Sequence, residues 1–378
     1  MEPIYLDHAA TTPVNPGVME AMISVYQETF GNASSVHQFG RKARKLLDNA
    51  RLTIAESIHA KEKEIIFTSG GTEADNLAII GTALANQHKG KHIITTSIEH
   101  HAVLHAVEYL EKEGFEVEYL PVDEAGQVSI KDFHSKLRDD TILVSIMMVN
   151  NETGAVQPIE EIAEITAEHQ AYLHSDIVQA YGLYSIDVEK LPIDMLTVSS
   201  HKINGPKGIG FLYVREGTLL QSLQYGGEQE RKRRAGTENI PAAVGFEQAV
   251  KLLLENRTDR LNHYKKMKHV FLEKLGEETV FNINGEEEST VPTIVNVSFP
   301  GMNVETLLTN FDLSGIAASS GSACTAGSVE PSHVLSAMFG SEDPKTTNSI
   351  RFSFGSANTE ENVAEAAMRV GQIVKRLS

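Results

Sequence analysis

Thr197-Val198-Ser199-Ser200-His201-Lys202-Ile203-Asn204-Gly205-Pro206-Lys207-Gly208-Ile209-Gly210 joins two apolar runs and places a lysine between them. The runs at 195–198 and 210–214 each predict a short buried strand. A lysine at the mouth of a buried strand loses part of its hydration, which lowers its pKa and frees the amine for Schiff-base chemistry. A lone loop lysine is usually a surface residue, so the interpretation of Lys202 depends on what the other strand ends carry.

Strand-like and helix-like segments alternate through the first half of the chain. Strands are predicted at 64–68, 92–96, 115–121, 141–149, 171–175 and 196–199. Helices are predicted near 15–28, 40–60, 72–86, 101–112, 129–137 and 159–169. This alternation predicts an α/β fold with a mostly parallel sheet and helices on both faces.

A smaller α+β domain is expected after the sheet. A long polar helix over 244–275 leads out of the sheet, and a strand at 293–299 and helices near 304–311 and 359–377 follow. We therefore expect residues 16–258 to form the large domain. Residues 1–15 and 259–378 are expected to form the small domain.

Composition excludes several classes of function. The net charge of −18 argues against direct nucleic-acid binding or an anionic membrane surface, and the basic run 231–234 is interpreted as a solvated loop. No apolar run approaches the roughly 18 residues of a membrane span, and residues 1–7 lack the basic and apolar regions of a signal peptide. The one cysteine, Cys324, excludes a disulfide framework and a Cys-rich zinc site. A cytoplasmic protein is expected.

Polar side chains follow the predicted strands, where an open α/β sheet binds its ligands. Residues 69–73 carry two glycines at a helix start, which suits an anion, although a simple N-cap by Thr72 is an equal alternative. His100 could stack on a planar ligand, and Asp176 could pair with a protonated ring nitrogen or merely cap a helix. No metal site is expected, because the pair His101 and His105 has no evident third ligand.

One ligand would use an anion cradle, an aromatic ring, a carboxylate and a lysine together. Pyridoxal 5′-phosphate has a phosphate, a flat ring, a ring nitrogen and an aldehyde. The joint occurrence of these groups at strand ends therefore predicts a pyridoxal-phosphate site.

Motifs along almost the whole chain also resemble one family. They are Tyr5–Pro13, Gly31–His37, Phe67–Asn76, Asn150–Gly154, Ser200–Lys202, Arg234–Asn239 and Ser320–Cys324. The sequence resembles cysteine desulfurases of the NifS/IscS-like group, which are pyridoxal-phosphate enzymes of fold type I in the class-V aminotransferase family. His8, Ala33 and the lack of an arginine after Gly355 depart from the usual pattern and put only fine substrate or partner preferences in doubt.

The resemblance implies specific roles for residues. Lys202 would hold the cofactor covalently, His100 would stack on its ring and Asp176 would pair with the ring nitrogen. The remaining implied cofactor contacts are Gly71, Thr72, Asn151, Gln179, Ser199, His201 and Thr237, the last from the partner subunit of a homodimer. Arg351 and Asn32 are the implied substrate-binding residues. An arginine fits a carboxylate in a bidentate way, and the apolar flanks of Arg351 predict a strand entering a core.

Cys324 lies in a run of small residues, 314–328, which predicts a mobile loop. A sole cysteine is more often a buried apolar residue, but that interpretation fits a Gly- and Ser-rich loop poorly. The resemblance implies that Cys324 takes sulfur from L-cysteine as a persulfide, leaves L-alanine, and passes the sulfur to an acceptor. An iron–sulfur scaffold or a tRNA 2-thiouridylase would be that acceptor. A selenocysteine lyase, an aminotransferase and a non-catalytic scaffold subunit are the alternatives.

Overall fold

The computed structural model describes residues 2–320 and 331–378. Its main element is a seven-stranded sheet with the order β2-β8-β7-β6-β5-β3-β4. The strands are β2 (Ile65–Thr68), β3 (His92–Thr96), β4 (Glu116–Leu120), β5 (Thr141–Ser145), β6 (Tyr172–Asp176), β7 (Met195–Ser199) and β8 (Gly210–Val214). β8 runs antiparallel to both neighbours and the other pairs are parallel. The expected mostly parallel sheet is confirmed.

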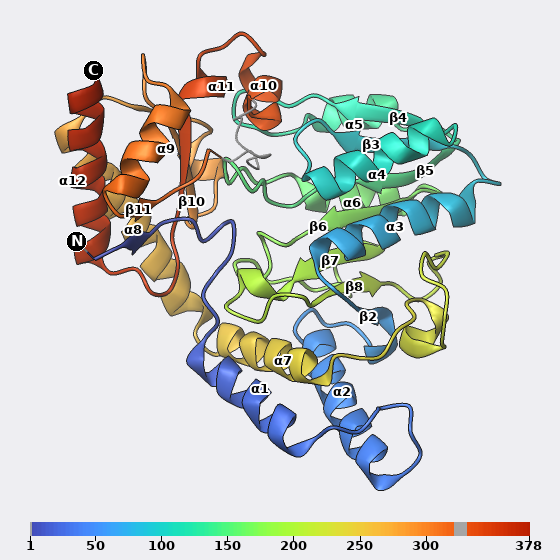
Figure 1. The fold of residues 1–378 in the computed structure, drawn as a ribbon. Coiled ribbons are helices and arrows are strands. Elements are labelled where there is room, and N and C mark those ends of the chain that lie inside the picture. The colour runs from blue at the N-terminus through green and yellow to red at the C-terminus, as the bar shows by residue number, and fades with distance from the viewer. Residues whose placement is uncertain (1, 321–330) are drawn as a thin grey trace.

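Helices cover both faces of this sheet (Figure 1). α3 (Gly71–Asn86) and α4 (His101–Lys112) share one apolar cluster with strand residues such as Leu143 and Leu212. The other face packs against α1 (Pro16–Glu28), α2 (Gln38–Glu56), α5 (Ile130–Lys136), α6 (Ile159–Ala167) and α7 (Ile240–Glu255). Because both faces are covered, β5 and β7 are buried along their whole length.

A second group of elements lies beside the sheet and contains both ends of the chain (Figure 1). A three-stranded sheet has the order β12-β10-β9, and a two-stranded parallel sheet joins β1 to β11. The elements are β1 (Ile4–Tyr5), α8 (Arg257–Glu278), β9 (Asn282–Ile283), β10 (Ile294–Ser298), α9 (Val304–Leu313), β11 (Ile316–Ala317), α10 (His333–Phe339), α11 (Lys345–Asn348), β12 (Ser349–Ser353) and α12 (Glu360–Leu377). An apolar cluster around Phe271, Phe311 and Phe352 fills the space between α8, α9, α12 and the strands, whereas α10 packs on Ile98. The division at residues 15/16 and 258/259 stays a prediction.

Two predicted elements differ from the structure. The long helix expected over 244–275 is two helices, α7 and α8, separated at Asn256, which has φ −127° and ψ 28°. The physical reason is that Leu253 packs into the core of the large sheet whereas Tyr264 packs into the second core. The strand expected over 141–149 ends at Ser145.

The chain after β5 leaves the regular ladder for a local reason. The backbone N–H of Met147 donates to the carboxylate of Glu99 instead of to a neighbouring strand. Ile146 and Met148 still donate to the backbone of β6 on one side. The segment therefore stays extended and carries Asn151 towards the edge of the sheet. Within residues 2–320 and 331–378, no helix has both the length and the apolar character needed to cross a membrane.

Candidate active site

The carboxyl ends of five strands meet around one cavity of about 380 Å³. β2, β3, β5, β6 and β7 all point the same way, so the residues that follow them gather at one edge. The cavity is lined by these residues predicted from the sequence: Gly71, Thr72, His100, Asn151, Asp176, Gln179, Ser199, His201, Lys202 and Arg351. The structure thus brings together residues separated by up to 280 positions, the distance from Gly71 to Arg351.

Lys202 ends the short turn η2 (Ser200–Lys202) directly after β7. Its Nζ donates to the carbonyl oxygens of Ala9 and Ala10, the latter at 2.9 Å. Burial, followed by the positive charge of Arg351, lowers the pKa of Lys202 to about 8, against the opposing effect of Asp176. A fraction of the amine is therefore neutral, and hence nucleophilic, near neutral pH.

Asp176 is the last residue of β6 and is buried. Its Oδ1 accepts a hydrogen bond from the backbone N–H of Val178 at 2.8 Å. Burial raises the pKa of Asp176 to about 6, while the Val178 N–H and the charge of Lys202 act in the opposite direction. The carboxylate is thus ionised at neutral pH and can hold a positively charged group.

His100 is the N-cap of α4 and its ring is fixed by the backbone. Nδ1 accepts a hydrogen bond from the N–H of Ala102 at 3.1 Å, so the proton of the neutral ring is on Nε2. Burial and then the charge of Lys202 lower the pKa of His100 to about 4. The ring is therefore neutral at physiological pH and holds one transferable proton.

The start of α3 forms the anion-binding end of the cavity. Gly70 has φ 152°, a conformation that a side chain would strain, and α3 begins at Gly71, where the first backbone N–H groups have no partner within the helix. A Cβ on Gly71 would lie 3.3 Å from Cγ2 of Val178. The hydroxyls of Thr72 and Ser199 and the ring of His201 line the same cavity. This combination suits a phosphate group.

Arg351 lies in β12 and closes the cavity from the second group of elements. Its guanidinium donates to Asp7 Oδ1 at 2.8 Å and to the carbonyl oxygen of Asn151 at 2.9 Å, while no described residue accepts a hydrogen bond from its Nε. The side chain is only 4% exposed. It is thus a cation held at the cavity wall with one donor still available for an anion.

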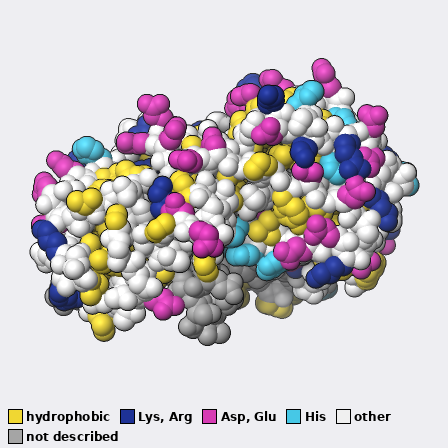
Figure 2. Space-filling model, turned by 90° about the horizontal axis from the view of Figure 1, so that it is seen from above, with side chains coloured by type: hydrophobic (Ala, Val, Ile, Leu, Met, Phe, Trp, Pro, Cys, Tyr) yellow, Lys and Arg dark blue, Asp and Glu magenta, His cyan; other side chains and the backbone are white. Residues whose placement is uncertain are grey.

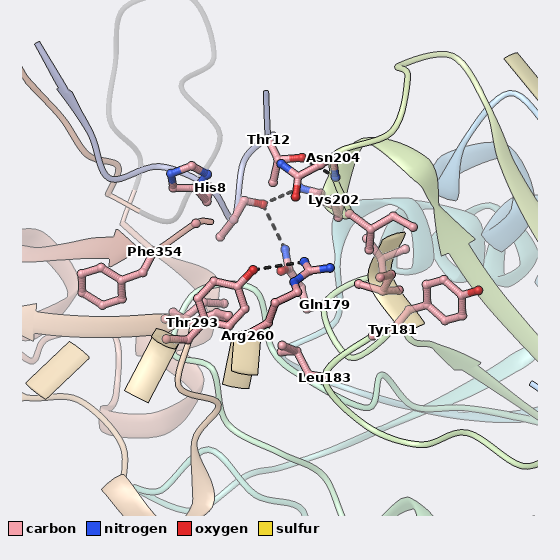
Figure 3. Close-up of a pocket in the computed structure, with 18 residues that line it drawn as sticks. His8, Thr12, Gln179, Tyr181, Leu183, Lys202, Asn204, Arg260, Thr293 and Phe354 are labelled. Atoms are coloured by element: carbon pink, nitrogen blue, oxygen red, sulfur yellow. Dashed lines mark hydrogen bonds between the residues drawn. The ribbon is translucent and has the colours of Figure 1, made fainter. Parts of the chain in front are cut away.

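Behind Lys202 lies a smaller cavity of about 50 Å³, shown in Figure 3. Gln179 Nε2 and Lys202 Nζ both donate to the carbonyl oxygen of Ala9, which stands between the two cavities. The ring of His8 lines this space, and neither of its nitrogens is in hydrogen-bonding geometry with a described residue. A side chain at position 355 would collide with this ring, because a Cβ on Gly355 would lie 2.2 Å from it.

Three predicted residues are not found in the main cavity. Thr237 is exposed and borders a separate cavity of about 180 Å³. Asn32 is exposed in the loop between α1 and α2, where its side chain accepts from the N–H of Ser34 at 2.8 Å. Cys324 lies outside the described residues. The roles assigned to all three stay predictions.

The described residues that flank the segment 321–330 lie beside the cavity. Ser319 exchanges backbone hydrogen bonds with Arg351 at 3.2 and 2.6 Å. On the other side, Ser332 donates to Glu152 at 2.5 Å, and His333 donates to the backbone of Glu99 at 2.9 Å. Figure 2 shows histidine side chains gathered near the boundary between the two halves of the molecule.

The sequence interpretation missed two carboxylates of the site. Asp7 pairs with Arg351, and Asp75 lines the cavity from α3. Asp75 could have been found as a charged residue on the face of α3 that buries Ala74 and Ala78. Nothing in the local sequence of Asp7 indicated its partner, which is 344 residues away. In the described part of the chain, no cluster of three His, Cys, Asp or Glu side chains has metal-binding geometry.

The groups that line the cavity fit pyridoxal 5′-phosphate. A glycine cradle and a helix start suit the phosphate, Asp176 suits a protonated ring nitrogen, and Lys202 suits an aldehyde. The ring of His100 and the amide of Gln179 line the same cavity and suit the flat ring of the cofactor.

Comparison with known proteins agrees with this fit. The model of the class-V aminotransferase family matches residues 4–365. A protein from Bacillus subtilis (strain 168) named "Putative cysteine desulfurase IscS 1" is 58% identical over 379 residues, covering 100% of both chains. A "Cysteine desulfurase IscS" from Methanosarcina thermophila is 48% identical and covers 99% of this chain and 92% of its own.

A solved "NIFS-LIKE PROTEIN" superimposes with a TM-score of 0.93 at 35% identity, covering 99% of this chain and 100% of its own. That likeness extends over both groups of elements and confirms the expected fold type I. The chain therefore belongs to the class-V aminotransferase family, in its NifS/IscS-like group of pyridoxal-phosphate-dependent enzymes.

Proposed function

We propose that the protein is a cysteine desulfurase that converts L-cysteine into L-alanine and carries the removed sulfur as a persulfide on Cys324. The observation that carries this proposal is the convergence of Lys202, Asp176 and Arg351 on one cavity, with both flanks of the segment 321–330 beside it. The relatives named above carry the same activity in their names.

Asp176 and Lys202 prepare the cavity for the cofactor. When bound, pyridoxal phosphate withdraws electrons from the substrate carbon next to the amine. Asp176 would support this by providing a negative charge for the protonated ring nitrogen. Lys202 would hold the aldehyde of the cofactor, and its amine, which is partly neutral near neutral pH, would accept the proton of the substrate Cα.

Arg351 and His100 act on the substrate directly. Arg351 is positioned by Asp7 and the backbone of Asn151, and it binds the α-carboxylate of L-cysteine. His100 presents its Nε2 proton to the cavity and exchanges protons with the substrate. One solved relative of this chain, 37% identical, is described as "SspA in complex with cysteine".

Cys324 takes the sulfur. It follows Ser319, which pairs with Arg351 of β12, by five positions, so about 18 Å of extended chain at most joins the two residues. Its thiolate attacks the substrate sulfur, a sulfur–sulfur bond forms and the Cβ–sulfur bond breaks. The electron pair of the broken bond stays on the carbon side. Protonation at Cβ and the return of a proton to Cα then yield L-alanine.

The proposed assembly is a homodimer that delivers sulfur to an acceptor protein. Thr237 is exposed and does not line the main cavity of its own chain. This position fits its expected role at the cofactor of the partner subunit. An iron–sulfur scaffold or a tRNA 2-thiouridylase is the proposed acceptor.

The test is release of L-alanine from L-cysteine by the purified protein. Wild type with pyridoxal phosphate is expected to form L-alanine, and Lys202→Ala is expected to lose both the cofactor absorbance and the activity. Lys207→Ala is the matched control, because Lys207 is an exposed lysine on the same turn. Formation of a keto acid instead of L-alanine would indicate an aminotransferase. Turnover of selenocysteine alone would indicate a selenocysteine lyase.

A further inference from the structure

A second buried carboxyl group, Asp75, lines the cofactor cavity next to Asp176. Asp75 is 1% exposed and comes from α3, which crosses one face of the large sheet. Its Oδ1 has no hydrogen-bond partner among the described residues. Nothing in the proposed mechanism uses this group, and a buried carboxyl group without a role is costly to retain.

The strand register explains how polar side chains collect beneath Asp176. His174 and Asp176 are two residues apart on β6, so both side chains face α3. In the sheet, His174 lies opposite Ser145 of β5 and Asp176 lies opposite Thr197 of β7. A small polar layer therefore fills the space between β6 and Asp75.

His174 connects this layer to Asp75. Its Nδ1 is 2.9 Å from Ser145 Oγ, and its Nε2 is 3.0 Å from Thr197 Oγ1 and 3.6 Å from Asp75 Oδ1. Complete burial lowers the pKa of His174 to about 3, so the ring is neutral. The neighbours Ser145, His174 and Thr197 are therefore all uncharged. None of them could balance a negative charge on Asp75.

The two carboxyl groups differ in what surrounds them. Asp176 has the backbone N–H of Val178 and the charge of Lys202 to stabilise its ionised form. Burial and then the charge of Asp176 raise the pKa of Asp75 well above the ordinary value, with Thr197 acting in the opposite direction. If the two carboxyl groups bind one proton between them, that proton therefore resides mainly on Asp75.

We propose that Asp75 is a protonated residue of the cofactor cavity, which limits the cavity floor to the one negative charge of Asp176. A single charge matches a singly charged ring nitrogen, whereas two adjacent carboxylates would repel each other. The inference rests on the proposed placement of the cofactor, so one of its tests uses the protein without cofactor.

The protonation state is measured by infrared difference spectroscopy of the cofactor-free protein at neutral pH. Wild type minus Asp75→Asn is expected to contain the carbonyl band of a protonated carboxylic acid. A difference that contains only carboxylate bands overturns the proposal. Glu99→Gln is the reference, because Glu99 is also buried and its pKa is raised to about 8. This result does not depend on whether the proposed function is correct.

The effect of the Asp75 charge on the cofactor is measured by the affinity for pyridoxal phosphate and by the absorbance of the bound cofactor as a function of pH. The amide of Asp75→Asn has the shape of a neutral carboxyl group. The affinity of this variant for pyridoxal phosphate is therefore expected to stay within about threefold of wild type, and the pH profile of the cofactor absorbance should not change. Asp176→Asn is expected to lose about tenfold or more and to shift the profile. If Asp75→Asn behaves like Asp176→Asn, Asp75 is ionised in the wild type and the proposal is wrong.

Discussion

The reactivity of Lys202 comes from the groups around it. Burial and Arg351 favour the neutral amine, whereas Asp176 and Asp7 favour the charged form, and burial dominates. An ordinary lysine has a pKa near 10.5, so almost none of its amine is neutral at neutral pH. The lowered pKa of Lys202 therefore determines how fast the protein without cofactor can capture an aldehyde.

The first prediction concerns the rate of cofactor capture. The rate at which the cofactor-free protein binds pyridoxal phosphate covalently should rise with pH and level off above about pH 8, where Lys202 becomes neutral. Stopped-flow absorbance over a pH series measures it. A rate that keeps rising beyond about pH 10 would show that Lys202 titrates as an ordinary lysine.

The second prediction concerns Arg351. Replacing Arg351 with Lys keeps the charge but removes the planar fork that contacts Asp7 and the backbone of Asn151. The KM for L-cysteine should rise about tenfold or more, which corresponds to one charged hydrogen bond of about 1.5–3 kcal/mol. Arg369→Lys is the control, because Arg369 pairs with Glu365 on α12 instead. An unchanged KM would remove Arg351 from the substrate site.

At the scale of elements, α10 anchors the chain that follows the segment 321–330. Ser332 is the N-cap of α10, accepting from the N–H of Leu335 at 3.1 Å and donating to the buried Glu152 at 2.5 Å. His333 adds a hydrogen bond to the backbone of Glu99, and the centre of its ring lies 4.8 Å from that of His101. The chain after the segment is thus tied to residues next to His100 and Asn151, which line the cavity.

The third prediction tests this anchor. Ser332→Ala should lower the free energy of unfolding by about 1–3 kcal/mol, because it removes a helix cap and leaves Glu152 without its hydrogen bond. Urea denaturation measures the change. Ser336→Ala, one turn further along α10, should have an effect below about 0.5 kcal/mol. Equal effects of the two substitutions would contradict the anchoring role.

The sequence predicts the elements well where apolar periodicity is undisturbed. The predicted bounds of β7 and β8 lie within one residue of the observed ones, because both strands are short apolar runs that end in turn residues. The break between α7 and α8 could not be predicted, because Asn256 is neither proline nor glycine and the two helices separate only to reach different cores.

The site is predictable to the extent that its residues follow strands. Lys202 and Asp176 are the clear examples, since strand direction alone gathers them at one edge. The pairing of Arg351 with Asp7 and the position of Asp75 depend on long-range packing, which local patterns do not contain.

At the scale of the whole molecule, an apolar surface extends over α1, the following loop and α2. Its members are Ile23 at 53%, Tyr26 at 66%, Phe30 at 81%, Val36 at 89% and Phe39 at 46% exposure. A group of large exposed apolar residues of this kind is typical of an interface. We therefore expect this surface to be buried in the proposed homodimer.

The fourth prediction is that the protein in solution has twice the mass of one 41.4 kDa chain. Light scattering after size-exclusion chromatography measures it, and the double variant Phe30→Asp, Val36→Asp should shift the mass towards the monomer. Leu313→Asp is the control, because Leu313 is 81% exposed elsewhere on the molecule. A monomeric wild type at micromolar concentration would rule out the dimer.

The central claim is that Cys324 receives the sulfur of L-cysteine, and mass spectrometry tests it most directly. The protein is exposed briefly to L-cysteine without reductant and then digested. The account predicts a gain of one sulfur atom on the peptide that contains Cys324, matched by the release of one L-alanine, and no gain in Cys324→Ser. Release of L-alanine at the wild-type rate by Cys324→Ser, again without reductant, would contradict it.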